Sequence, residues 1–238
     1  MRNLLVLSAI AAATAAPAFA QEVTVTGNVA LATDYAFRGI SQTAENPAIQ
    51  GGLDVAFGDS GFYAGAWGSS INFGPAYSDG NSNMELDLYG GYKFALGPVA
   101  MDVGVLGYFY PGAPDDLGGD LDFYEVYAKP SIALSEQFTL GGNISYSPDF
   151  QNETGDAWYY EVNGTFVASP ELSFSGAVGM QNVDTAGFFA GEDEYTTWNI
   201  GGTYSVLGLG LDLRYHGTDV DNADAFDDRV IFSIKKAL

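Results

Sequence analysis

The stretch that decides the fold runs from residue 85 to residue 105 and reads ELDLYGGYKFALGPVAMDVGV. Around a central turn at 95–98, apolar residues alternate with polar or charged ones. Leu86, Leu88 and Phe94 share one face of the first segment, and Glu85, Asp87 and Lys93 share the other. A period of two residues predicts β-strands with one apolar and one polar face. The Gly97-Pro98 connection predicts a tight hairpin turn between them.

The same unit repeats along the chain, with connections that alternate strictly between short and long. The short connections lie at 58–61, 95–98, 135–137, 168–171 and 205–208, and the long ones at about 35–46, 73–83, 111–120, 148–157, 182–194 and 217–228. Outer-membrane barrels have tight periplasmic turns and long external loops. We therefore predict an all-β chain that forms a single closed antiparallel up-and-down transmembrane β-barrel. About twelve strands fit between residues 23 and 237, and an even number returns both termini to one side.

Glycine and proline positions inside the expected strands add detail to the wall. Gly-Gly pairs at 51–52, 90–91, 141–142 and 201–202 fall within strands, where glycine relieves coiling strain and admits neighbouring aromatic side chains. Pro130 lies inside the sixth strand and cannot donate a ladder hydrogen bond. We expect a β-bulge at this position.

The first twenty residues have the pattern of a secretory signal peptide. Arg2 is followed by an apolar, alanine-rich segment and by Ala18-Phe19-Ala20, a typical cleavage site. The expected organisation is therefore a signal peptide at 1–20 and an outer-membrane barrel at 21–238, in a Gram-negative bacterium. The chain contains no cysteine, and a closed barrel needs no disulfide because its hydrogen-bond ladder is complete. No cofactor is expected.

The formal net charge of −22 is unevenly distributed. More than half of the acidic residues fall in the long connections, where Arg38 is the only base. Such a surface repels nucleic acid and attracts cations. The partners expected from this reading are outer-membrane lipid and lipopolysaccharide, the barrel-assembly machinery, and small solutes or cations.

Four motifs in the first part of the expected mature chain resemble a known family. They are residues 25–42, which include Asp34-Tyr35-Ala36-Phe37-Arg38-Gly39, and residues 47–52, 61–69 and 85–92. This pattern resembles the TorF-type porin family of proteobacteria, described by a Gly-Cys-Trp motif. The resemblance implies an outer-membrane barrel that forms a pore, without an established substrate or catalytic residues. Ala66 stands where the motif has cysteine, so a thiol-dependent role is excluded here.

Arg38 is the strongest single candidate for a functional residue. Folded into the barrel, it would meet carboxylates and form a constriction of the kind that sets ion selectivity in pores. The alternative is a structural clamp, in which Arg38 pairs with an acid such as Asp34 and pins the first loop.

A second set of candidates comprises charged residues on the inward face of the expected strands. They are Asp54, Glu85, Asp87, Lys93, Asp102, Glu125, Lys129, Glu161, Asp212, Arg214 and Arg229. Acids outnumber bases in this set, which predicts a cation-selective lumen if the barrel conducts. The alternative is a plug of paired charges without a continuous water path, since charges buried in a barrel of intermediate size must pair or hydrate.

The remaining candidates are weaker. His216 is the only histidine; it could serve as a catalytic base beside a serine, but the sequence has no nucleophile motif. Asp219, Asp221 and Asp224 resemble a calcium loop only partly, because Ala223 replaces a ligand, so weak divalent binding is the most they predict. Trp67, Trp158 and Trp198 are expected to face outward near the membrane interfaces as anchors.

Together these observations predict a porin for passive passage of small polar solutes or ions, leaning towards cations, and not an enzyme. Two alternatives stay open. The first is a non-conducting structural or adhesive barrel with a plugged lumen, and the second is a barrel-embedded hydrolase that uses His216.

Overall fold

The computed structural model describes residues 23–73, 83–113, 120–221 and 223–238. The expected signal peptide and its cleavage near Ala20 lie outside the described residues, as do the loop acids Asp115 and Asp116. No helix in the described part of the chain is long and apolar enough to cross a membrane.

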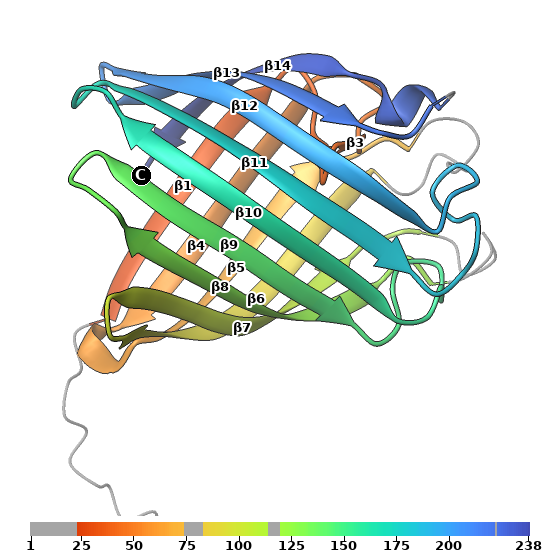
Figure 1. Ribbon diagram of the computed structural model, residues 1–238, viewed down its shortest axis with the longest axis horizontal. Helices are drawn as coiled ribbons and strands as arrows, with labels where there is room; N and C mark the ends of the chain where they lie inside the picture. The colour runs from red at the N-terminus through yellow and green to blue at the C-terminus, as the bar shows by residue number, and fades with distance from the viewer. Residues whose placement is uncertain (1–22, 74–82, 114–119, 222) are drawn as a thin grey trace, which may run out of the picture.

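Within the described residues, twelve antiparallel strands close into one barrel, as the sequence predicts (Figure 1). They are β1 (Val23–Ala32), β4 (Ala48–Phe57), β5 (Phe62–Ser70), β6 (Met84–Leu96), β7 (Val99–Phe109), β8 (Phe123–Ala133), β9 (Phe138–Ser147), β10 (Ala157–Val167), β11 (Leu172–Val183), β12 (Glu194–Val206), β13 (Leu209–Thr218) and β14 (Arg229–Ala237). Each strand pairs with its neighbours in sequence, and β1 closes the ring by pairing with β14. Strands of this length, tilted, suffice to span a bilayer.

The two ends of the barrel differ. The short connections 58–61, 97–98, 134–137, 168–171 and 207–208 share one end with Val23 and Leu238, which we call the turn end. The long connections share the other end, which we call the loop end; their described parts are 33–47, 71–73, 83, 110–113, 120–122, 148–156, 184–193, 219–221 and 223–228. Figure 1 shows the loop end on the right.

The wall has an apolar outer face and a polar inner face. Large apolar side chains on the outside are strongly exposed, including Val162 (63%), Ile200 (66%) and Val230 (62%). Their sequence neighbours point into the barrel, as shown by the polar contacts that Glu161 and Asn163 make with each other. An apolar surface of this extent is typical of a protein that lipid surrounds.

Inward tyrosines lie against glycines of adjacent strands. A Cβ on Gly91 would meet the ring of Tyr63, and a Cβ on Gly104 would meet that of Tyr127. Because these glycines leave space, the tyrosine rings lie flat against the wall and their hydroxyls reach neighbouring groups, such as Asp102 from Tyr63. The expectation that the Gly-Gly pairs admit aromatic side chains thus holds at Gly91, and Gly104, which lies outside those pairs, is a further case.

The expected bulge at Pro130 is wrong. Ala128 of β8 pairs with Ile144 of β9, and three residues further along each strand Ser131 pairs with Gly141. The register is therefore the same on both sides, and no extra residue is inserted. Pairing is interrupted only at Lys129 and Pro130, because proline has no N–H to donate.

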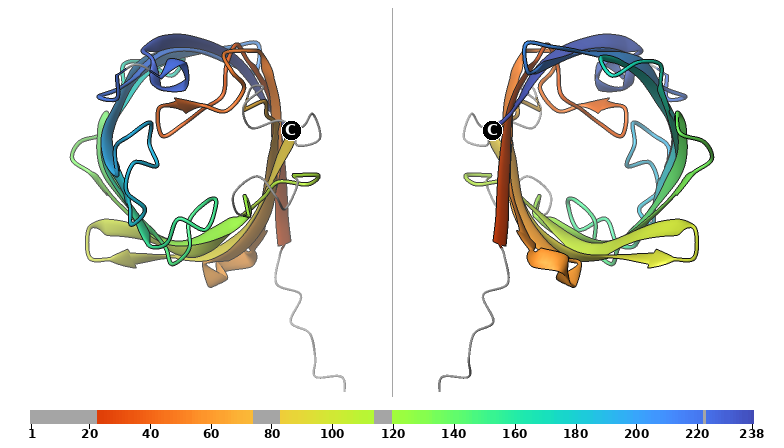
Figure 2. Two further views of the ribbon diagram at one scale, coloured as in Figure 1. Left: turned by 90° about the vertical axis from the view of Figure 1, so that its right-hand side faces the viewer. Right: turned by 90° about the vertical axis from the view of Figure 1, so that its left-hand side faces the viewer.

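The loop end of the lumen contains a core of its own. Aromatic and aliphatic side chains from several connections and strand ends pack there, including Tyr110, Phe123, Phe150, Phe189, Tyr195 and Phe226. The short 3-10 helix η2 (Asp224–Phe226) contributes the last of these. Viewed along the barrel axis, the segment between β1 and β4 folds into the ring (Figure 2).

Candidate functional site: a hairpin that crosses the lumen

The connection between β1 and β4 carries a small hairpin of two strands, β2 (Ala36–Phe37) and β3 (Ile40–Ser41). Phe37 pairs with Ile40, so the loop between them is the two residues Arg38 and Gly39. Both have positive φ, +49° and +87°. Positive φ at both residues is what a two-residue hairpin loop of type I′ requires. Arginine is strained in it, at a cost of about 1–3 kcal/mol, so contacts made by its side chain must offset that cost.

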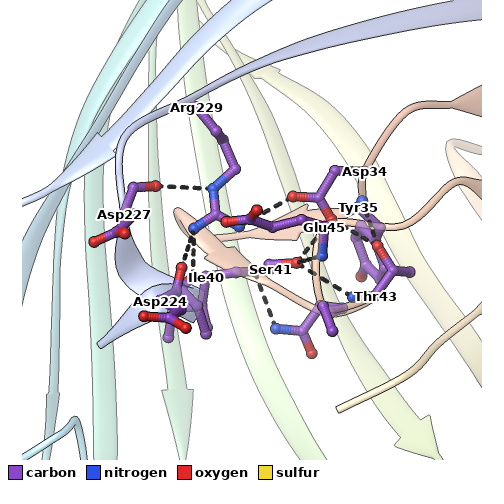
Figure 3. Close-up of polar contacts among 12 residues, drawn as sticks. Asp34, Tyr35, Ile40, Ser41, Thr43, Glu45, Asp224, Asp227 and Arg229 are labelled. Atoms are coloured by element: carbon purple, nitrogen blue, oxygen red, sulfur yellow. Dashed lines mark hydrogen bonds and ion pairs between the residues drawn. The ribbon is translucent and has the colours of Figure 1, made fainter. Parts of the chain in front are cut away.

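A buried polar network at Asp34 fixes the base of the hairpin (Figure 3). The Asp34 carboxylate accepts hydrogen bonds from the hydroxyls of Ser41 at 2.7 Å and Thr43 at 2.6 Å. It also pairs with Arg229 of β14 at 3.0 Å, with both side chains almost fully buried. Arg229 in turn donates to the backbone carbonyls of Asp224 and Ala225 in the last connection. The first and last loops are thereby joined through one guanidinium group.

Tyr35 ties the hairpin to the wall beside β5 and β6. Its hydroxyl donates to Glu85 at 2.8 Å, and its ring packs edge-on against Trp67 at 5.4 Å. Trp67 therefore faces the lumen, and the expectation that it anchors the outer surface is wrong. The register explains why: Trp67 lies opposite Asp87, an inward residue, and directly paired residues share a face.

Arg38 at the hairpin tip contacts the opposite side of the barrel. Its guanidinium donates to Glu125 of β8 at 2.7 Å and to Gln181 of β11 at 2.5 Å. It lies over the ring of Tyr159 at 4.1 Å, and its backbone carbonyl accepts from Tyr195 at 3.0 Å. The side chains of Arg38 and Glu125 are 7% and 4% exposed. The hairpin thus spans the lumen from β5 and β6 to β8, β11 and β12.

The electrostatics of the tip keep Arg38 charged. Burial alone would lower the pKa of Arg38, but the adjacent Glu125 carboxylate outweighs it and the net pKa lies above the ordinary value. The specific partner suggested from sequence is wrong, because Asp34 pairs with Arg229 and not with Arg38. The general form of the clamp, an arginine that pins the first loop, does describe the geometry. The role of Arg38 as a constriction stays a prediction.

The hairpin separates two cavities in the lumen. On its turn-end side lies a polar chamber of about 270 Å³, lined by Arg38, Glu125, Lys129, Glu161 and His216 among others. On its loop-end side lies a largely aromatic cavity of about 390 Å³. Phe37 lines both. The tip of the hairpin and its partners therefore form the partition between the two spaces.

Contacts place the charged residues predicted to face inward on the lumenal side. Asp54 accepts a hydrogen bond from Tyr89, and Glu161 accepts one from Tyr159. The side chains of Lys93 and Asp102 lie within 4.0 Å of each other, and Asp212 forms an ion pair with Arg214. The Lys129 ammonium group lies over the ring of Tyr127. Glu85, Asp87, Glu125 and Arg229 belong to the hairpin surroundings described above. Among the described residues, Asp54, Glu85, Asp87 and Glu161 have no base within 4.0 Å, and Oδ1 of Asp87 is buried without a hydrogen-bond partner.

The catalytic role of His216 and weak divalent binding at Asp219, Asp221 and Asp224 stay predictions. His216 lines the polar chamber, and no serine hydroxyl donates to it among the described contacts. Asp219 accepts a hydrogen bond from the backbone of Thr196. In the described ranges, Asp219, Asp221 and Asp224 are not part of any group of three or more side chains able to hold a metal ion.

The other two tryptophans face outward. Trp158 stacks on Tyr160 on the outer face of β10, and Trp198 of β12 alternates with the inward residues Thr197 and Asn199. Both lie near the loop end, so their role as interface anchors stays a prediction.

Sequence reasoning considered Arg38 folded into the barrel against carboxylates, but it missed the hairpin that carries Arg38 and the aromatic cavity. The one local signal was Arg38-Gly39 between the apolar residues Phe37 and Ile40, which fits a two-residue hairpin loop. Nothing in that stretch shows on which side of the barrel mouth the hairpin lies. That depends on contacts with Glu125 and Gln181, which are distant in sequence.

A family model described as "Bacterial protein of unknown function (Gcw_chp)" matches residues 14–237. The description assigns the family no activity, and the TorF-type resemblance stays a prediction. No curated protein sequence matches the chain.

Solved structures with a similar fold include porins and channels. The NanC porin has a TM-score of 0.56 at 12% identity, covering 90% of this chain and 98% of that one. The COG4313 outer membrane channel from Pseudomonas putida F1 has a TM-score of 0.51 at 13% identity, covering 90% and 94%. OmpF of Salmonella typhi, in complex with daunomycin, has a TM-score of 0.50 at 8% identity, covering 91% and 97%. At these identities the similarity shows the fold alone.

Proposed function

We propose that this chain, which belongs to the Gcw_chp family of bacterial proteins, forms a channel in the outer membrane of a Gram-negative bacterium. It passes small polar solutes or ions passively and favours cations. The observation that carries the proposal is the polar chamber, which is separated from the loop-end cavity by a single hairpin held at its tip by Arg38. Similarity in fold to a porin and to an outer membrane channel supports the assignment.

The cation preference rests on the balance of lumenal charge. Each of the bases Arg38, Lys93, Arg214 and Arg229 has an acid within 4.0 Å in the described structure. Lys129 has no such acid there and lies over the ring of Tyr127. Further carboxylates on the same inner face have no such base. A lumen with surplus carboxylates raises the local concentration of cations and lowers that of anions.

Recording from the purified full-length protein in planar lipid bilayers tests the proposal. Under a potassium chloride gradient, we expect discrete conductance steps and a reversal potential whose sign reports cation preference. Asp54→Asn together with Glu161→Gln should move the reversal potential towards zero, and the turn substitution Asp59→Asn should leave it unchanged. A silent protein, or one that prefers chloride, would contradict the proposal.

A second candidate, a non-conducting barrel with a plugged lumen, is favoured by one observation. The hairpin is fixed by buried ion pairs at both its base and its tip, and its neighbourhood is densely packed with aromatic rings. The same recordings separate the two, because a permanently plugged barrel gives no conductance in the wild type. Heat-modifiable migration of the sample on gels would show that such a silent barrel is folded.

A further inference from the structure

The loop-end cavity has walls built mainly from aromatic rings. Its volume is about 390 Å³, within the range of pockets that hold small organic molecules. Rings from separate connections and strand ends line it, among them Phe73, Phe150, Phe188, Phe189, Tyr195 and Phe226. Several of these contact one another in edge-to-face geometry, as Phe189 does with Tyr195 at 4.7 Å. The cavity thus offers ring faces and ring edges to a flat guest.

The charged groups that line the cavity are acidic. The carboxylate-bearing residues Glu45 and Asp224 belong to its lining, together with amide side chains. No base lines it among the described residues: the Arg38 side chain points to the polar chamber, and Arg229 is paired with Asp34. An organic anion would find no unpaired cation here.

We propose that this cavity binds a protonated amine carried on an aromatic ring system, with the ring among the phenylalanines and the ammonium group towards Glu45 and Asp224. Ring faces attract cations, and the attraction increases when the cation is partly desolvated. A bare metal ion fits less well, because it needs several oxygen ligands and no such group exists among the described side chains. This inference adds a ligand class to the proposed cation preference. It rests on the proposed function in one respect, which is that the cavity lies at the outer mouth of the channel.

Three indole compounds with the same ring and different charge test the ligand class. Tryptamine is cationic, tryptophol is neutral and indole-3-acetate is anionic at pH 7. Isothermal titration into the full-length protein in detergent, corrected by titration into empty micelles, should give saturable binding of one tryptamine per barrel. We expect tryptophol to bind about tenfold more weakly, because it lacks the cation–π contribution, and indole-3-acetate not to bind. Hexylamine, which carries the charge without the ring, should also bind at least about tenfold more weakly than tryptamine.

Paired substitutions locate the binding. Phe188→Leu and Asp224→Asn should each weaken tryptamine binding several-fold. Their matched controls, Phe174→Leu on the outer face of β11 and Asp59→Asn at the turn end, should not. The proposal would be overturned if the three indoles bound with equal affinity, or if hexylamine bound as tightly as tryptamine. It would also be overturned if tryptamine binding were unchanged by both cavity substitutions.

The result is separable from the test of the channel. A protein that conducts cations but does not bind tryptamine overturns the binding site and leaves the channel standing. A protein that binds tryptamine through Phe188 and Asp224 but does not conduct overturns the channel and leaves the binding site standing.

Discussion

At the scale of single residues, the lumen depends on two adjacent positions at the hairpin tip. Arg38 is held in a left-handed conformation that arginine seldom adopts, and its contacts with Glu125, Gln181 and Tyr159 compensate. Gly39 beside it has no side chain because there is no space for one. A Cβ at this position would lie 2.5 Å from the Thr197 hydroxyl and 2.6 Å from a methyl group of Thr218.

The first prediction concerns the buried ion pair at the tip. Arg38→Met leaves the Glu125 carboxylate buried without its partner, which costs about 3–5 kcal/mol, so the tip should leave its seat and single-channel conductance should rise. Arg38→Met combined with Glu125→Leu removes both charges, and the tip should then remain seated with conductance near that of the wild type. Lys93→Met, at a pair that is 64% exposed on the lysine side, is the control. If the single and double variants conduct alike, Arg38 does not act through Glu125.

The second prediction separates backbone strain from steric exclusion. Gly39→Ala and Gly97→Ala both place alanine at a positive φ, +87° and +61°, at a cost of about 1–2 kcal/mol each. A Cβ at Gly97 meets nothing within 4 Å, whereas one at Gly39 collides with Thr197 and Thr218. We expect only Gly39→Ala to raise conductance, with both variants losing stability in urea unfolding. Equal conductance of the two variants would show that the space between Gly39, Thr197 and Thr218 accommodates a side chain.

At the scale of elements, the strands follow from local pattern and the inward hairpin does not. Alternation of apolar and polar residues predicts which face of a strand meets lipid, and contacts place the predicted strand charges such as Asp54 and Arg214 on the lumenal side. Trp67 follows this alternation, because it shares the inward face of its strand with Tyr63. The prediction for Trp67 was wrong because it relied on residue type, which suggested an interface anchor. The hairpin was missed because its position depends on long-range partners.

The third prediction concerns the seam between β8 and β9, where Pro130 leaves a ladder donor missing. Pro130→Val restores an N–H without changing the register, and one added hydrogen bond stabilises by about 1 kcal/mol. The free energy of unfolding in urea, measured in lipid vesicles, should rise by that amount. Ala128→Val, two residues earlier on the same face, adds side-chain volume without a new donor and is the matched control. An equal gain from Ala128→Val would attribute the effect to the side chain alone.

At the scale of the whole molecule, the barrel is asymmetric along its axis. The turn-end half has a polar chamber with an exposed Lys129, and the loop-end half has an aromatic core and a crossing hairpin. The sequence predicts only one part of this asymmetry, which is the excess of acidic residues in the long connections. It does not predict the aromatic core, since aromatic residues of loops and strand ends carry no periodic signal that assigns them to a lumen.

The asymmetry gives a prediction for intact cells, because the chain has no cysteine of its own. A thiol introduced by Lys129→Cys lies in the chamber beyond the hairpin as seen from the loop end. If the loop end faces outward and the lumen favours cations, a positively charged methanethiosulfonate reagent added outside should label it faster than a negatively charged reagent of similar size. Adding Arg38→Met should accelerate both reactions, because the partition opens. Asp59→Cys at the turn end lies on the far side of the membrane, so its labelling measures the reagent that has crossed the membrane by any route. Faster labelling by the negative reagent would contradict the charge argument, and labelling unaffected by Arg38→Met would show that solutes do not pass the hairpin tip.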